Sequence, residues 1–197
     1  MPRNALSREQ IVQAAIALLD SEGADGLSMR RLGSRLGTTG AAVYWHVEGK
    51  EEILLLATDA VWRDMPLPDP EGIGWRTAAT TMANDLYAML LRHPWLVRTM
   101  PLRSPWGPAR THHDDHLLSV YEAAGFTGSE AEQATRTVLT FVLGTALDSA
   151  PDAALTRRAV CKDGEPLAPT GQDVHRNLAF GLGAILDGLQ SRLPTRS

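Results

Sequence analysis

Cysteine is nearly absent from this sequence, and several kinds of site are excluded with it. The chain has 197 residues and one cysteine, Cys161. An intramolecular disulfide, a four-cysteine zinc site and a CxxC redox pair are therefore excluded. We interpret the single thiol as a spectator in a reducing compartment, with a redox sensor as the alternative.

Long apolar runs are absent too. No N-terminal stretch joins a positively charged start to an apolar run of about 7–15 residues, as a signal peptide does. No segment reaches the roughly 18 apolar residues that a membrane span requires. We therefore expect a cytoplasmic protein with no membrane partner.

An excess of positive charge is the third absence. Lys and Arg together number 19 and Asp and Glu 23, which gives a formal net charge of −4. This argues against a protein that coats nucleic acid over its whole surface, but it says nothing about a local basic patch. The composition, 44% apolar and 21% charged, is that of a globular chain with a core.

Strand signals are nearly absent, whereas helical periodicity is strong, so we predict an all-α fold. Ser7 and Gln10 fit a capping box and Gly23 is a natural stop, which bounds the first helix. Ser28 can cap the second helix. Further helices are expected over residues 41–46, 50–65, 75–89, 93–99, 109–124, 154–160 and 173–193.

One more helix is expected in the second half of the chain, where two capping boxes are possible. These are Thr127 with Glu130 and Ser129 with Glu132.

The stretch from Pro66 to Gly74 divides the chain. Its three prolines lack the backbone N–H and its two glycines add conformational entropy, so no helix continues through it. We therefore predict two parts, residues 1–49 followed by a linker helix over 50–65, and residues 66–197.

Two short helices around a tight turn, over residues 28–46, form the first candidate site. Gly37 permits the turn, and Val43 is expected to anchor the second helix in the core. Such an arrangement places the second helix in a DNA major groove. The face that we expect to be exposed presents Thr39, Gly40, Ala42, Tyr44 and His46.

Aromatic and charged residues of this segment have alternative interpretations. Tyr44 and Trp45 can be core aromatics, an interpretation that we favour for Trp45. Residues 27–50 hold four positive side chains against Glu48, a surplus of three that suits phosphate binding better than an ordinary solvated face. The four are Arg30, Arg31, Arg35 and Lys50.

Three segments of the sequence resemble the DNA-binding domain of TetR-family transcriptional regulators. They are ALLDSEG, LSMRRLGSRLG and AAVYWHVEGKEEIL. Gly40 and Ala42 replace side chains that often read bases in relatives, so we expect fewer direct base contacts. The resemblance implies that DNA is contacted by Ser28, Arg30, Thr39, Gly40, Ala41, Ala42, Tyr44, His46 and Lys50.

The second part resembles the regulatory domains of the same family, in RHPWLVRTMP, TFVLGTAL and FGLGAILDGL. The resemblance implies a homodimer with a four-helix interface, and a helix that is apolar on more than one side needs such a second partner. Two-fold symmetry would set the recognition helices about 34–36 Å apart on DNA. The apolar stripe consists of Leu139, Val142, Leu182, Ile185 and Leu189.

A small-molecule effector is the other partner that the resemblance implies, bound in an apolar pocket between helices. For each residue taken alone we favour a place in the core, whereas for the set we favour a ligand cavity, and no cofactor or metal is expected. The candidates are Trp62, Met82, Leu86, Met100, Trp106, His116, Tyr121 and Phe141.

The favoured function is a ligand-responsive transcriptional repressor on a palindromic operator, not an enzyme. A metal-dependent hydrolase built on the His112–His116 cluster is one alternative, because these two histidines lie four residues apart on a helix. A helical interaction module that no longer binds DNA is the other.

Overall fold

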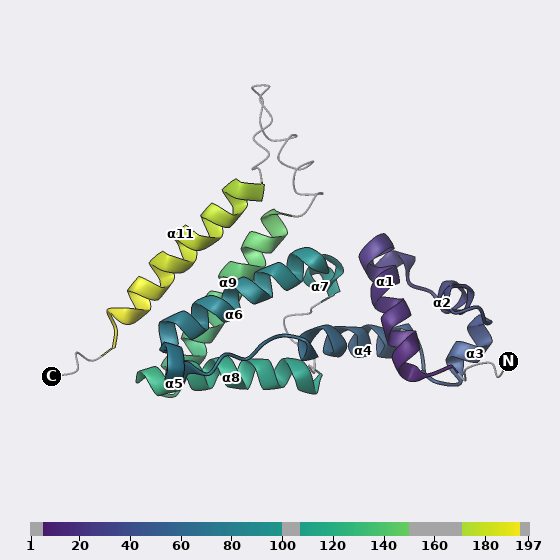
Figure 1. Cartoon of the computed structure of the whole chain (residues 1–197), viewed down its shortest axis with the longest axis horizontal. Coiled ribbons are helices and arrows are strands. Elements are labelled where there is room, and N and C mark those ends of the chain that lie inside the picture. The colour runs from purple at the N-terminus through teal and green to yellow at the C-terminus, as the bar shows by residue number, and fades with distance from the viewer. Residues whose placement is uncertain (1–5, 100–106, 150–170, 194–197) are drawn as a thin grey trace, which may run out of the picture. The chain divides into compact units, whose positions relative to one another are not determined.

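The computed structural model describes residues 6–99, 107–149 and 171–193, and the regular secondary structure in these ranges is all helical (Figure 1). The prediction of an all-α fold is therefore confirmed. No helix in these ranges has both the length and the apolar character that a membrane crossing needs. In chain order the helices are α1 (Arg8–Gly26), α2 (Met29–Arg35), α3 (Gly40–Tyr44), α4 (Lys50–Arg63), α5 (Pro70–Ile73), α6 (Trp75–Arg92), α7 (Trp95–Thr99), α8 (Pro108–Ala124), α9 (Ser129–Asp148) and α11 (Gly171–Gln190).

The chain forms two compact units, which we describe one at a time. The first comprises Met1–Asp64 and Arg92–His112, and the second comprises Met65–Leu91 and His113–Ser197. The sequence suggests a single division near residue 65 and assigns everything after it to the second part. The structure also divides the chain there, but it returns residues 92–112 to the first unit.

A local sequence signal sets the beginning of α1, whereas the helix ends at Gly26, three residues beyond the predicted stop at Gly23. The Ser7 hydroxyl accepts a hydrogen bond from the Gln10 N–H at 3.1 Å, and the Gln10 side chain accepts one from the Ser7 N–H at 3.0 Å. The predicted capping box is therefore confirmed. Gly23 interrupts the helix with a φ of 70°, a left-handed conformation that favours glycine.

Asp59 on α4 holds the beginning of α8 within the first unit. Its buried carboxylate accepts a hydrogen bond from the Ala109 N–H at 2.8 Å and pairs with Arg63 at 2.7 Å. A negative charge at a helix N-terminus is stabilising, so the carboxylate caps α8. Gly107 lies so close to Asp59 that an added methyl group would overlap with the carboxylate.

Two further contacts attach residues 92–112 to the first unit. The Arg110 guanidinium lies 4.2 Å from the centroid of the Trp62 ring, a cation–π contact between buried side chains. On α1, the Asp20 carboxylate accepts a hydrogen bond from Trp95 Nε1 at 2.7 Å and lies 2.7 Å from His93 Nδ1. These contacts with side chains of α1 and α4 thus explain why residues 92–112 belong to the first unit rather than the second.

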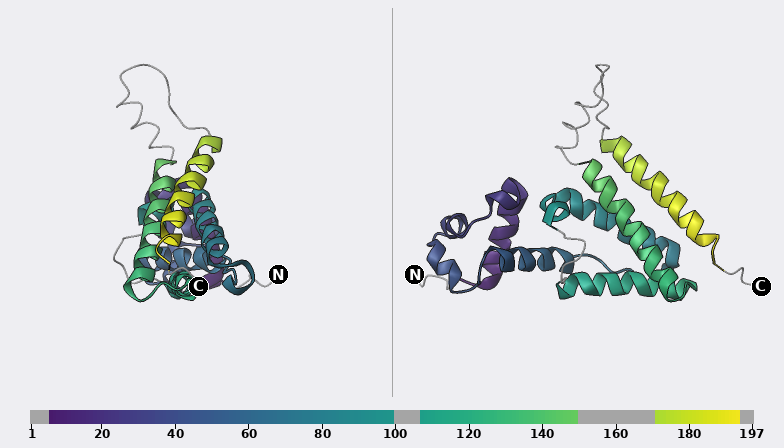
Figure 2. Two further views of the ribbon diagram at one scale, coloured as in Figure 1. Left: turned by 90° about the vertical axis from the view of Figure 1, so that its left-hand side faces the viewer. Right: turned by 180° about the vertical axis from the view of Figure 1, so that it is seen from behind.

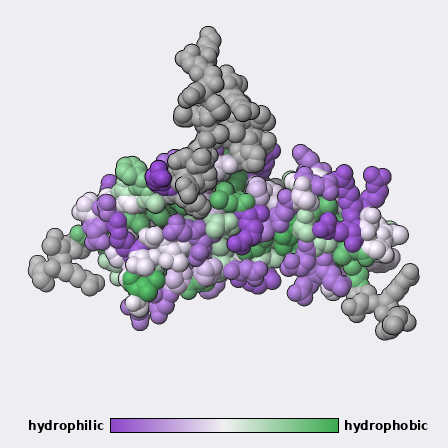
Figure 3. All heavy atoms as spheres, turned by 45° about the horizontal axis from the view of Figure 1, so that its top comes forward, coloured by the Kyte–Doolittle hydropathy of each residue, from purple (hydrophilic) through white to green (hydrophobic). Residues whose placement is uncertain are grey.

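In the second unit, α9 and α11 run side by side (Figure 2). Trp75, Tyr121 and Phe126 form an aromatic cluster with ring centroids 5.9 to 6.0 Å apart. The Tyr87 hydroxyl lies 3.0 Å from the Ser149 hydroxyl, a hydrogen bond that joins α6 to the end of α9. On the face shown in Figure 3, hydrophobic side chains lie in separate patches among hydrophilic ones.

A short helix, α5, lies within the stretch for which the sequence predicts none. It begins at Pro70, because proline lacks only an N–H that a first helical turn does not use. The Asp69 side chain accepts a hydrogen bond from the Glu71 N–H at 2.9 Å and caps the helix.

The two capping boxes proposed for α9 are wrong. Gly128 precedes the helix with a φ of 45°, and no side chain caps it. The helix expected over residues 154–160 and Cys161 lie outside the described residues.

Candidate nucleic-acid interface and ligand site

The backbones of α2 and α3 are in near contact. A methyl group added at Gly33 would lie 2.5 Å from the backbone nitrogen of Gly40. One added at Gly40 would lie 3.1 Å from the backbone nitrogen of Arg30. Because backbone atoms cannot move aside as a flexible side chain can, Gly33 is needed to seat α3 on α2, whereas a side chain at position 40 would require the α2 backbone to shift by a few tenths of an ångström.

Hydroxyl groups begin both helices of this motif. The Ser28 side chain accepts a hydrogen bond from the Arg31 N–H at 3.3 Å, as predicted, and the Thr39 side chain accepts one from the Ala42 N–H at 3.2 Å. These bonds satisfy N–H groups that have no partner within the helix. Val43 is fully buried and anchors α3, as predicted.

Two aromatic rings lie exposed at the end of α3. Tyr44 is 58% exposed and Trp45 is 87% exposed. The prediction that Trp45 belongs to the core is therefore wrong, because Val43 and Val47 take the buried positions on either side of it. His46 is exposed as well.

Exposed cations lie on the helices next to α3 in the chain. Arg30 and Arg35 on α2 and Lys50 at the start of α4 are all exposed. Arg31 instead forms an ion pair with Glu22 on α1 and also donates to a carbonyl of that helix. The positive charge available to a phosphate from residues 27–50 is therefore smaller than the sequence count implies.

This combination, a short helix seated on its neighbour with exposed rings and nearby cations, matches the geometry of a DNA-reading motif. Residues 11–57 match the family model described as bacterial regulatory proteins, tetR family, and residues 67–168 match the tetracyclin repressor-like C-terminal domain. The chain belongs to the TetR family. It is a DNA-binding transcriptional regulator, and the family is one of regulators rather than enzymes.

Relatives resemble this TetR-family protein over nearly its whole length. The HTH-type transcriptional repressor DrrR1 of Streptomyces coeruleorubidus is 31% identical over 96% of this chain and 79% of its own. Tetracycline repressor protein class A from transposon 1721 of Escherichia coli is 29% identical over 95% and 92%. ActR of Streptomyces coelicolor, solved in complex with actinorhodin, is 29% identical over 99% and 100%, with a TM-score of 0.81.

Residues predicted to contact an effector fall in different parts of the TetR-family protein. Met82 and Leu86 on α6 and Tyr121 on α8 are buried in the second unit. Trp62 belongs to the first unit, where it stacks with a guanidinium. Outside the described residues lie Met100 and Trp106.

Phe141 and His116 each make a contact within the second unit. The Phe141 ring on α9 lies against Gly181 of α11, so close that a side chain at this glycine would overlap with it. The His116 ring donates a hydrogen bond from Nε2 to the Pro68 carbonyl at 2.9 Å. Contact of either side chain with an effector stays a prediction.

Tyr121 combines complete burial with an unsatisfied hydroxyl. No described residue forms a hydrogen bond with its phenol oxygen, while its ring packs on Trp75 and Phe126. Burial raises the pKa of this phenol above its ordinary value, so the hydroxyl keeps its proton and can donate a hydrogen bond. The sequence does not reveal Trp75 and Phe126 as its neighbours, because Trp75 is distant in the chain.

The histidine cluster of α8 is dispersed by the fold. His113 is buried and His112 is exposed, and His116 faces the Pro68 carbonyl. Within the part of the chain that the structure describes, no group of three or more His, Cys, Asp and Glu side chains is placed to hold a metal ion. This arrangement disfavours the hydrolase alternative.

The stripe predicted to form a dimer interface is only partly at the surface. Val142 and Leu182 are buried within one chain, so they offer no surface to a second copy. Leu139, Ile185 and Leu189 are half-buried.

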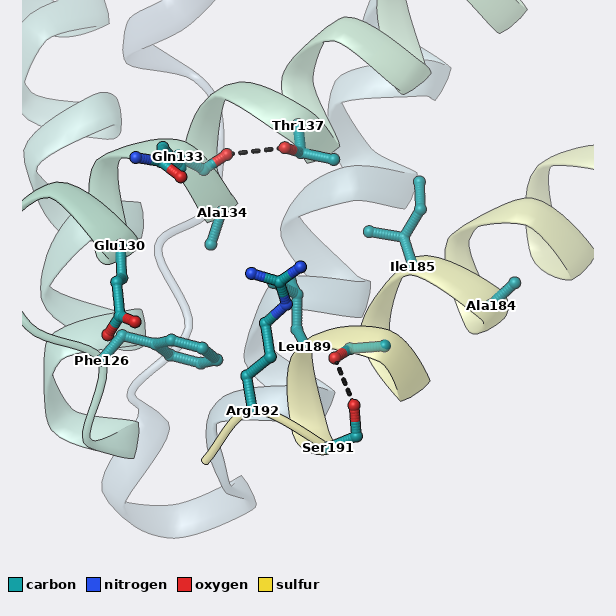
Figure 4. Close-up of a pocket in the computed structure, with 11 residues that line it drawn as sticks. Phe126, Glu130, Gln133, Ala134, Thr137, Ala184, Ile185, Leu189, Ser191 and Arg192 are labelled. Carbon is teal, nitrogen blue, oxygen red and sulfur yellow. Dashed lines mark hydrogen bonds between the residues drawn. The ribbon is translucent and has the colours of Figure 1, made fainter. Parts of the chain in front are cut away.

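A pocket of about 470 Å³ lies between α9 and α11, and the Arg192 side chain points into it (Figure 4). Ile185 and Leu189 are among the residues that line it. The prediction missed two apolar residues of these helices, Phe180 and Leu147, of which Phe180 is 81% exposed. The exposed apolar surface of α9 and α11 therefore includes Phe180 and Leu147, which the predicted stripe does not contain.

Replacement of Gly33 by alanine should displace α3 from α2 and abolish DNA binding. The added methyl group would overlap with the backbone of Thr39 and Gly40, and we expect the free energy of unfolding to fall by about 1–3 kcal/mol. Binding is measured by gel shift on a duplex selected from random DNA by the unaltered chain, and stability by urea unfolding.

The control is Gly72→Ala in α5, where an added methyl group meets nothing within 4 Å. This variant should keep both the stability and the DNA affinity of the unaltered protein. Full DNA affinity in Gly33→Ala would show that α3 does not need its close seat on α2.

Proposed function

We propose that this TetR-family protein is a cytoplasmic repressor that binds a palindromic operator as a homodimer and leaves it when a small-molecule effector binds. The exposed rings of Tyr44 and Trp45, on a helix seated by backbone contact, are the observation that carries the proposal. Two relatives that cover almost all of the chain are named as repressors. A coupling of about 1–3 kcal/mol between effector and operator would be enough to switch occupancy.

Arg30 and Lys50 are the charged residues proposed to contact DNA. Both are exposed, and they stand on the helices that precede and follow α3. Lys50 also begins α4, so a phosphate contact there would hold the first turn of that helix against DNA. Trp45, which the sequence places in the core, joins Tyr44 among the proposed contacts because its ring is exposed.

Replacement of both Arg30 and Lys50 by alanine should abolish specific operator binding without unfolding the protein. Neither side chain is buried, so the unfolding midpoint should stay unchanged. Lys50→Ala alone should lower the slope of log affinity against log salt by about 2 per dimer, because each protomer would then neutralise one phosphate fewer. Fluorescence anisotropy on the selected duplex over a salt series measures both effects.

The matched control is Arg92→Ala at the end of α6, which removes an exposed arginine outside α2, α3 and α4. It should leave affinity and salt slope unchanged. An unchanged salt slope in the Lys50 variant would exclude a phosphate contact by this residue. Failure of the unaltered chain to select any duplex would favour the interaction-module alternative.

The exposed apolar surface of α9 and α11 is proposed to bind a second copy of the chain. Phe180 and Leu147 are exposed there, and large apolar side chains at the surface commonly mark an interface. Two small residues of α11, Ala184 and Gly188, are exposed and line the pocket between α9 and α11. A helix of the second copy could approach closely at this point and cover the pocket.

Replacement of Phe180 by aspartate should convert the dimer into a monomer, because a charge would be buried without a partner at the interface. The same variant should lose most of its operator affinity, since only a dimer engages both half-sites. Sedimentation velocity measures the mass.

Leu91→Asp serves as the control, since Leu91 is an exposed apolar residue on α6 rather than on α9 or α11. It should remain a dimer. A Phe180 variant that sediments as a dimer would place the interface elsewhere.

The effector is proposed to be a polycyclic aromatic compound that receives a hydrogen bond from Tyr121. A buried hydroxyl without a partner costs stability, so a ligand oxygen that accepts a hydrogen bond from it would restore that loss. Trp75 and Phe126 would offer the aromatic surface beside it. ActR was solved with actinorhodin, and several relatives are tetracycline repressors, so actinorhodin and tetracycline are the probes to use.

Replacement of Tyr121 by phenylalanine should raise the concentration of the active probe needed for half-release of the operator. The expected rise is roughly three- to tenfold, the value of one neutral hydrogen bond. The same change should leave the ligand-free protein equally stable or more stable, because it removes an unsatisfied hydroxyl.

Tyr87→Phe is the control with the opposite signature. The Tyr87 hydroxyl has a partner, Ser149, so its loss should lower the free energy of unfolding by about 1 kcal/mol and leave effector response intact. A Tyr121 variant that loses stability and keeps its effector response would assign Tyr121 to the core alone.

A further inference from the structure

The reading face of α3 has little capacity for hydrogen bonds to bases. The helix consists of Gly40, Ala41, Ala42, Val43 and Tyr44, and it contains no charged or amide side chain. Amide and charged side chains are those that form bidentate contacts with adenine and guanine in the major groove. Any such contact must therefore come from outside α3.

Two further positions, Thr39 and Gly40, offer no bidentate reading group. The Thr39 hydroxyl accepts the Ala42 N–H at 3.2 Å, so it is engaged in capping the helix. Gly40 faces the α2 backbone, where an added methyl group would lie 3.1 Å from the Met29 carbonyl carbon and the Arg30 nitrogen. A longer side chain at position 40 would have to alter the seat of α3.

Methyl groups remain on the face that is free to meet a groove. Ala41 is exposed, Ala42 is half-buried, and the rings of Tyr44 and Trp45 follow them. On base edges in the major groove, the C5-methyl group of thymine is the apolar feature that such a surface can recognise.

We propose that α3 selects thymine through its C5-methyl group, with Ala41 and Ala42 as the residues that contact it. The inference rests on the proposed operator binding and specifies what is read there. The contact of Arg30 with DNA supplies positive charge and orients the protein on the duplex. The methyl groups of Ala41 and Ala42 distinguish thymine from cytosine at the base positions beneath α3. An operator half-site is therefore expected to hold at least one thymine whose methyl group is essential.

The experiment uses the full chain and the duplex that it selects from a random pool. Each thymine is replaced in turn by deoxyuridine, which keeps pairing with adenine and the O4 acceptor and removes only the methyl group. We expect affinity to fall about fourfold at one or two thymines in each half-site, the value of one buried methyl group, and to stay unchanged elsewhere.

Protein variants then assign the contact. Ala41→Gly and Ala42→Gly should each abolish the difference in affinity between the thymine and deoxyuridine duplexes at one base position. At any other base position the difference should remain. Ala123→Gly, at an exposed alanine on α8, should preserve every difference. This position-specific loss separates a contact with thymine from a general weakening of a helix by glycine.

Unchanged affinity after replacement of every thymine would overturn the proposal, as would glycine variants that keep all the differences. Either result would leave operator binding itself intact, because the duplex would still be selected and bound. A pool that yields no preferred sequence would instead contradict operator binding, and the thymine proposal with it.

Discussion

The position of the recognition helix depends on the near contact of two backbones at Gly33 and Gly40. Most helices are held by side chains that can repack, whereas α3 rests on atoms that have no such freedom. A helix of five residues makes few contacts of its own, so this seat and the buried Val43 determine where its outer face points. The orientation of Trp45 follows from the same constraint.

Carboxylates of α1 and α4 extend the first unit beyond the helix-turn-helix. Asp20 and Asp59 each accept a hydrogen bond from residues 92–112, and Asp59 does so while buried. A buried charge is tolerated only with partners, and here a helix N-terminus and Arg63 supply them. Electrostatic contacts thus add a distant stretch of chain to a unit whose other contacts are mainly apolar.

Local signals predicted most of what is local in this fold. Ser7 with Gln10, Ser28 and Val43 were assigned correctly because caps and helical spacing depend on a few neighbouring residues. The expectation of a core aromatic failed at Trp45, which has a valine two residues away on either side, because only the fold decides which of these apolar side chains are buried. Contacts of Tyr121 and of residues 92–112 were out of reach, since they join helices that are distant in sequence. The same holds for α9, where Val142 proved to face its own chain.

A first unit assembled from two separate stretches also constrains exchange of parts between relatives. A chimaera joined at residue 65 would supply Asp59 and Trp62 from one parent and Ala109 and Arg110 from the other. Unless the second parent keeps Gly107 and Arg110, a side chain at position 107 would overlap with the buried carboxylate, and the indole would lose its cation. Residues 92–112 should therefore travel with the N-terminal helices when regulatory domains are swapped, although they lie in the middle of the chain.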